Sequence, residues 1–144
     1  MPLWPKETEL GEGGEVKLEQ QVSSLDPSRR LKKLGVKQES YFWWEPIPID
    51  FDVAWRVTTN SSPCGELYDR GMTTLDCISA FTVAELGDML ATHLRAMFLK
   101  DDDGLWVGSY ERAGNRHGGF KADTEADARA KMLIHLIEQG IIKP

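Results

Sequence analysis

The spacing of apolar residues predicts several short strands. The segment 51–58 (FDVAWRVT) alternates, with its large apolar residues at every second position on one face, as is typical of a half-buried strand. Aromatic residues at 41–45 (YFWWE) predict a second strand, which we expect the prolines at 46 and 48 to end. A short strand near 75–79 and an irregular edge strand at 16–22 (VKLEQQV) are also expected.

A β-hairpin is expected in the second half of the chain. The turn sequence DDDG at 101–104 separates two apolar segments, 95–100 and 105–111. A competing interpretation extends the preceding helix to about residue 99, because apolar residues continue at helical spacing. We prefer the hairpin, and the alternative stays open at this stage.

Three helices are marked by capping signals. Thr82 with Glu85 three residues later forms a capping-box pattern, so a helix is expected from there to about residue 90. A shorter helix is expected over 27–34, and a longer one from about 124 to Gly140. The apolar stripe expected for the last helix is Ala126, Ala130, Leu133, Ile134 and Ile137.

These elements predict an α+β fold. We expect residues 16–144 to form a single two-layer domain, in which one antiparallel sheet packs against two to three helices. The sheet would contain the strands at 41–45, 51–58, 95–100 and 105–111, with the stripes of the two later helices on one of its faces. Residues 1–15 are expected to form a flexible leader or extension, because they are rich in glutamate, proline and glycine.

Composition and charge narrow the class of protein. The chain has 144 residues and a formal net charge of −6, which argues against a general nucleic-acid binder. It lacks a secretion-type apolar segment and a stretch of the roughly 18 apolar residues that a membrane span needs. A cytoplasmic location is therefore expected. The two cysteines, Cys64 and Cys77, are too few for a disulfide framework, so reduced thiols are expected, and a bridge between the two stays open because it depends on their Cα separation.

The aromatic run is the first candidate site. Side chains of consecutive strand residues face opposite sides of a sheet, so either Tyr41 and Trp43 or Phe42 and Trp44 would be exposed unless both faces are covered. Exposed tyrosine and tryptophan are typical of protein interfaces. Tyr41, Trp43 and Trp44 are therefore the candidate partner-binding residues.

The glycine-rich segment 112–121 is the second candidate site. Its glycines would expose backbone amides, and Arg112, Asn115, Arg116 and His117 would bind an anionic ligand. A flexible hairpin connection with solvated arginines explains the same residues. The basic cluster at 29–37 likewise fits either phosphate contacts or the solvent face of a helix. The carboxylates and histidines lack metal-binding spacing, so neither a metal nor a cofactor is predicted.

Four segments resemble a group of small phage and prophage proteins without an established activity. They are KLEQQVSSL (17–25), LKKLGVKQESYFWW (31–44), ISAFTVAELGDML (78–90) and ADTEADARAKMLIHLIEQGII (122–142). The resemblance implies a phage setting inside a bacterial host cell, and it supplies no catalytic residue.

The function expected from these observations is stoichiometric binding to a host or phage protein, without catalysis, and an anti-defence role is one form that such binding would take. The alternative is a nucleic-acid or nucleotide-ligand binder that uses the basic segment 112–121. An enzyme with a dispersed site is a third class, and the sequence shows no nucleophile beside a base.

Overall fold

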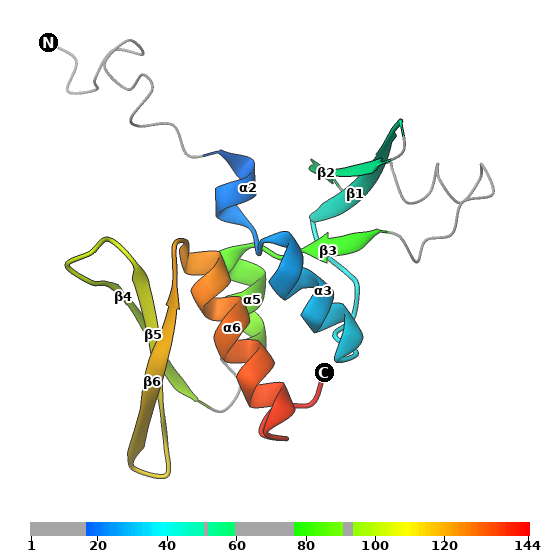
Figure 1. Ribbon diagram of the computed structural model, residues 1–144. Coiled ribbons are helices and arrows are strands. Elements are labelled where there is room, and N and C mark those ends of the chain that lie inside the picture. Colours follow the sequence, from blue (N-terminus) through cyan, green and yellow to red (C-terminus); the bar gives the residue numbers. More distant parts are fainter. Residues whose placement is uncertain (1–16, 51, 60–76, 91–93) are drawn as a thin grey trace, which may run out of the picture.

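The computed structural model describes residues 17–50, 52–59, 77–90 and 94–144 (Figure 1). The expected leader at 1–15 lies outside these residues, as do Phe51 and the segment 60–76. In chain order the elements are α2 (Leu18–Gln21), α3 (Leu25–Lys33), β1 (Phe42–Ile49), β2 (Asp52–Thr59), β3 (Ile78–Ala80), α5 (Val83–Leu90), β4 (Arg95–Lys100), β5 (Trp106–Arg112), β6 (Asn115–Ala122) and α6 (Glu125–Glu138).

The α+β class is confirmed, but the prediction of one shared sheet is wrong. The described strands form two antiparallel sheets of three strands, with the orders β2–β1–β3 and β4–β5–β6. The expected hairpin of β4 and β5 forms, and β1 and β2 also pair antiparallel. The third strand of each sheet keeps the two pairs in separate sheets, because β3 pairs with β1 and β6 pairs with β5.

Helix α6 occupies the centre of the molecule. It contacts β5 and β6 on one side and α3 and α5 on the other (Figure 1). The helix is therefore buried over most of its circumference. Its buried residues are Ala126, Ala128, Ala130, Met132, Leu133 and Leu136. We expected the stripes of both later helices to face one sheet, but α5 packs chiefly against α6. Of the expected α6 stripe, Ile134 and Ile137 are only partly buried.

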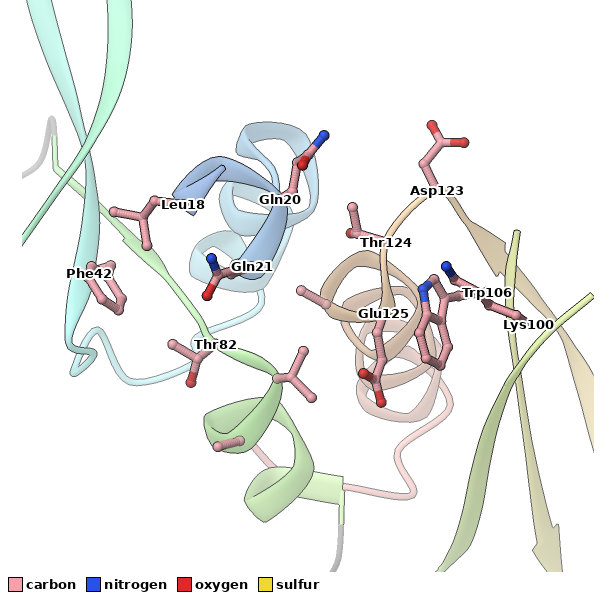
Figure 2. Close-up of a pocket in the computed structure, with 13 residues that line it drawn as sticks. Leu18, Gln20, Gln21, Phe42, Thr82, Lys100, Trp106, Asp123, Thr124 and Glu125 are labelled. Atoms are coloured by element: carbon pink, nitrogen blue, oxygen red, sulfur yellow. The ribbon is translucent and has the colours of Figure 1, made fainter. Parts of the chain in front are cut away.

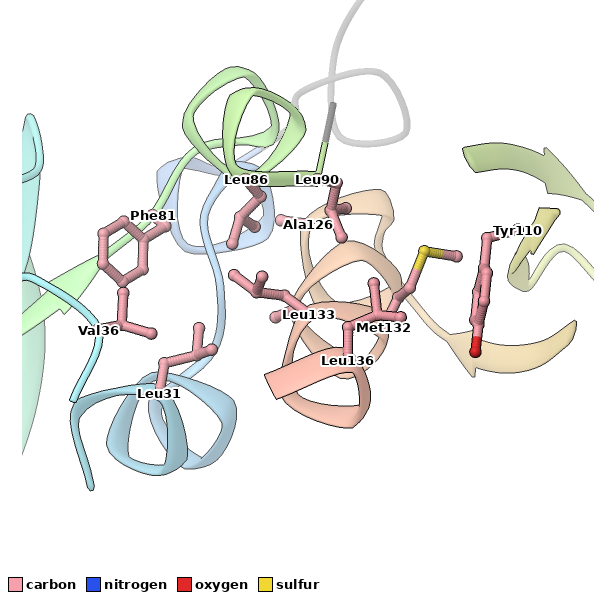
Figure 3. Packing of buried hydrophobic residues seen from close by; sticks show 11 residues of the cluster. Leu31, Val36, Phe81, Leu86, Leu90, Tyr110, Ala126, Met132, Leu133 and Leu136 are labelled. Carbon is pink, nitrogen blue, oxygen red and sulfur yellow. The ribbon is translucent and has the colours of Figure 1, made fainter. Parts of the chain in front are cut away.

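The main hydrophobic core lies around α6. Leu31 from α3, Leu86 and Leu90 from α5, and Tyr110 from β5 converge on Leu133 and its neighbours (Figure 3). A second, smaller core lies beside β1 and combines the buried residues Val22, Trp44, Ile78 and Ala80 with Leu25, Phe42, Trp55 and Val57. Val53 is 48% exposed, so it does not share the buried face that was predicted for it together with Trp55 and Val57.

A buried serine connects the segments near the two cores. The Ser23 hydroxyl accepts a hydrogen bond from the Phe81 backbone N–H at 3.0 Å and lies 2.7 Å from the Ser28 hydroxyl. The Ser23 carbonyl accepts from Trp44 Nε1 at 2.9 Å and from the Ser28 hydroxyl at 3.1 Å. Ser23 thus connects the start of α3, strand β1 and the end of β3.

The starts of α5 and α6 are formed as the sequence predicts, whereas α3 begins at Leu25, two residues before the expected start. The Thr82 hydroxyl accepts from the Glu85 N–H at 3.2 Å, and the Glu85 carboxylate accepts from the Thr82 N–H at 3.0 Å, which completes the capping box. The Thr124 hydroxyl accepts from the Asp127 N–H at 3.1 Å. Gly140, with φ of 71°, follows the end of α6 as expected.

Two predicted strand boundaries are wrong. The segment expected to be an edge strand at 16–22 contains the helix α2 instead, and only Val22 makes a β-bridge, to Thr82. Strand β1 continues through Pro46 and Pro48, because β3 pairs only with residues 42–44. Beyond that point β1 pairs, among the described strands, with β2 alone, and proline is tolerated at an edge where its missing N–H faces away from the ladder.

Cys77 also differs from its prediction. Its side chain is buried and disulfide-bonded, whereas reduced thiols were expected. Sequence spacing carries no information on the distance between two Cα atoms, which decides whether a bridge can form. The other cysteine of the chain, Cys64, lies outside the described residues.

Candidate functional site

The predicted partner-binding aromatic residues do not form one exposed surface. Trp44 is 9% exposed and belongs to the second core, so its assignment as a partner-binding residue is wrong. The reason is that the connection between α2 and α3 lies against the side of β1 that carries Trp44: Val22 and Leu25 pack in the same core, and the Ser23 carbonyl accepts a hydrogen bond from Trp44 Nε1. Trp43 points to the opposite face and is partly buried, and Tyr41 is 70% exposed.

The predicted anion-binding loop is a β-hairpin rather than a flexible loop. Ala113 (φ 53°) and Gly114 (φ 80°) form its two-residue turn, and Arg112 pairs across it with Asn115. Asn115, Arg116 and His117 therefore belong to strand β6, where their backbone is part of a sheet ladder. Glycine content alone misled the prediction, because glycine serves tight turns and bulges as well as loops.

The four residues proposed for this ligand site do not converge. Arg116 lies opposite Glu111, and its guanidinium is 3.6 Å from that carboxylate. His117 lies on the other face, where its ring stacks on Tyr110 at a centroid distance of 4.9 Å. Neighbouring residues of a strand face opposite sides, so Arg116 and His117 cannot bind one small ligand together.

The sheet β4–β5–β6 has one covered face and one open face. Phe98, Tyr110 and Phe120 project toward α6 and belong to the main core or pack against it. Figure 1 shows α6 beside this inner face and no described helix or strand over the other. On β4, Met97 is 44% exposed and Leu99 is 64% exposed, which fits their position on the outer face.

The outer face consists of three rungs of side chains that follow the strand register. The first rung is Leu99, Val107 and Lys121; the second is Met97, Ser109 and Gly118; and the third is Arg95, Glu111 and Arg116. A groove of about 400 Å³ lies over the second and third rungs. Apolar side chains therefore border a cationic groove on a surface that the described elements leave open.

A β-bulge produces this register. Gly108 pairs with Phe120 and Ser109 with Gly118, so Gly119 is the extra residue, and its φ is 95°. The bulge lets Phe120 and His117 both face inward although they are three residues apart. Because of it, Arg116 faces outward, beside Glu111. The sequence did contain a signal for the bulge, because the pair Gly118–Gly119 interrupts an otherwise strand-like segment and glycine inside a strand often marks a bulge.

Sequence reasoning missed this surface for a specific reason. The β4 segment RAMFLK carries apolar residues at four successive positions, so its periodicity does not show which face is buried. The uninterrupted run was nevertheless a signal, since a strand with apolar residues on both faces must be covered twice or expose one face.

A second hollow of about 580 Å³ lies between the starts of α5 and α6, α2 and the β4–β5 hairpin (Figure 2). Helix N-termini favour anions, but Asp123 and Glu125 already place carboxylates there. Thr124 is engaged as the α6 cap, and Glu125 is paired with Arg129 at 2.9 Å. The cap hydroxyl of α6 is therefore already hydrogen-bonded, and the carboxylates that line the hollow offset its positive charge. The hollow does not favour an anionic ligand.

An aromatic cluster on the inner face brings two histidines to Tyr110. The Tyr110 hydroxyl is 3.4 Å from His135 Nε2, and the His135 ring is 5.2 Å from that of Phe120. Within the described ranges, no group of three or more histidine, cysteine, aspartate or glutamate side chains is placed to bind a metal ion. His117 contacts this cluster by ring stacking, and His135 contacts it through its ring and through the hydrogen bond with Tyr110.

Comparison of the chain with protein-family models, with curated proteins and with solved structures finds no match. The resemblance to phage and prophage proteins therefore stays a prediction. Among the helices that the structure describes, none combines the length and apolar character needed to span a membrane.

Proposed function

We propose that this protein acts by stoichiometric binding to another protein, without catalysis, through the outer face of the β4–β5–β6 sheet. The partner would be a host or phage protein in a bacterial cytoplasm, with a host defence component among those expected. The observation that carries the proposal is an apolar row on adjacent strands, in which Met97 and Leu99 are exposed and Val107, opposite Leu99, is half-buried.

Contiguity distinguishes this row from ordinary exposed side chains. Single exposed apolar residues are common on protein surfaces and need no explanation. Here Leu99 lies directly opposite Val107, and Met97 is the next residue on the same face of β4. Contiguous apolar surface bordered by polar residues is typical of protein interaction sites.

The composition of the face supports a protein partner over the nucleic-acid alternative. Phe98, Tyr110 and Phe120 of this sheet face the core, and the Trp106 ring lines the hollow beside Lys100. Recognition of single-stranded nucleic acid depends on exposed rings that stack on bases, and the outer rungs carry none.

Site-specific photocrosslinking in the bacterial host tests the proposal. A benzophenone amino acid replaces Leu99 in one variant and Asp102, which is exposed in the adjacent turn, in the control. We expect one discrete crosslinked protein with the probe at 99 and none with the probe at 102. The absence of a crosslink at 99, or the same products at both positions, would contradict the proposal.

A further inference from the structure

We infer that the groove on the outer face of the β4–β5–β6 sheet binds an extended acidic segment of the partner protein. An aspartate or glutamate of that segment would lie between Arg95 and Arg116, and an adjacent apolar side chain would pack on Met97 and Leu99. This inference rests on the proposed function and specifies the chemistry of the partner.

The second rung has small residues on β5 and β6, and its one large side chain is Met97 on β4. Ser109 and Gly118 are neighbours on the second rung, and a Cβ added at Gly118 would lie only 3.2 Å from Ser109 Cβ. The rungs on either side belong to residues two positions away along each strand. The first and third rungs are therefore about 13 Å apart along the strands, which leaves room for an extended chain that runs parallel to the strands and contacts all three rungs.

Cations border the groove on the third rung. Arg95 makes no ion pair with any residue that the structure describes. The pair of Arg116 with Glu111 is exposed on both sides, with 61% and 46% of the side-chain surfaces accessible. Exposed pairs of this kind contribute little stability, so Arg116 is available to a competing carboxylate. A guanidinium binds a carboxylate through two parallel hydrogen bonds, which favours this class of ligand.

The charge of this face is opposite to that of the whole chain. Arg95, Arg116 and Lys121 project from it with Glu111, whereas the protein has a formal net charge of −6. Lys121 is 3.7 Å from Asp101 at the end of the first rung. An acidic segment is therefore attracted to this face, and the remaining surface repels it.

The apolar row favours an acidic peptide over other anionic ligands. A free phosphate or a nucleic-acid backbone would use the arginines but would leave Met97, Leu99 and Val107 in water. An extended peptide with a carboxylate and an apolar residue satisfies both groups at once. Its side chains at alternate positions lie about 7 Å apart on one face, which matches the distance between neighbouring rungs.

Selection from a random twelve-residue peptide library, with the full chain as bait, tests the inference. We expect enriched peptides to carry aspartate or glutamate two positions from an apolar residue. Their affinity, measured by fluorescence polarisation, should fall at least tenfold for Arg95→Gln and for Leu99→Ser. It should be unchanged for the control Lys33→Gln, which removes an exposed cation from α3.

The alternative results are informative. Failure to enrich any peptide, or acidic peptides that bind Arg95→Gln as well as the parent protein, would overturn the inference. Enriched peptides without carboxylates that still require Leu99 would overturn the acidic class and leave the proposed function standing. A random single-stranded DNA pool that binds more tightly than the peptides and depends on Arg95 would overturn both. A missing crosslink at 99 would instead count against the proposed function.

Discussion

Two buried serines offer a matched test of the hydrogen-bond network that connects the segments near the two cores. Ser23 and Ser79 are both completely buried, so replacing either with alanine removes one hydroxyl from the interior. The Ser23 hydroxyl accepts from the Phe81 N–H and contacts the Ser28 hydroxyl, whereas the Ser79 hydroxyl has no hydrogen-bond partner within the described structure. The two substitutions are equal in size, so they leave similar cavities.

The expected effects differ in sign. Ser23→Ala leaves the N–H of Phe81, itself 0% exposed, without its acceptor, and an unsatisfied buried donor costs about 1–3 kcal/mol. Ser28 keeps its bond to the Ser23 carbonyl, so this one donor dominates the loss. A cost of about 2 kcal/mol lowers the Tm of a protein of this size by roughly 4–8 °C. Ser79→Ala removes an unsatisfied hydroxyl, and we expect the free energy of unfolding to be unchanged or to rise by up to about 1 kcal/mol.

Thermal and urea unfolding, followed by circular dichroism, measure both variants against the parent protein. Equal destabilisation by Ser23→Ala and Ser79→Ala would refute the reasoning, because the effect would then come from the cavity or the backbone and not from the hydrogen bonds. An unchanged stability of Ser23→Ala would refute it as well.

Three further predictions concern packing, capping and the cysteine. A Cβ at Gly108 would lie 2.6 Å from Phe98 Cε1, so we expect Gly108→Ala to destabilise by about 1–3 kcal/mol in urea unfolding and the double variant with Phe98→Leu to lose less than the sum of the two single effects. Thr124→Ala removes the α6 cap and should cost about 1 kcal/mol, whereas Thr124→Ser should retain most of the stability; equal losses would contradict the capping role. Because Cys77 is disulfide-bonded, iodoacetamide should add no mass to the unfolded chain before reduction and two adducts after it, and adducts before reduction would show free thiols.

The sequence by itself determined the local structure wherever a short-range interaction decides the outcome. The capping pair Thr82 and Glu85, the cap at Thr124 and the turn after Lys100 all formed as expected, because their hydrogen bonds join residues within a few positions of one another. The α+β class followed from the resulting elements.

The tertiary structure alone decided which strands share a sheet and which faces stay open. Trp44 became a core residue because Val22 and Leu25, at the connection between α2 and α3, pack on its side of β1, and nothing within the YFWW run distinguishes that side from the other. Strand β6 exists because β5 supplies its partner, although its glycines favour a loop on local grounds. The open row of Met97 and Leu99 depends on which face of β4 the central helix α6 covers. Each outcome depends on contacts between segments that are distant in sequence. Apolar periodicity indicates that a face is buried, but it does not indicate which element covers that face.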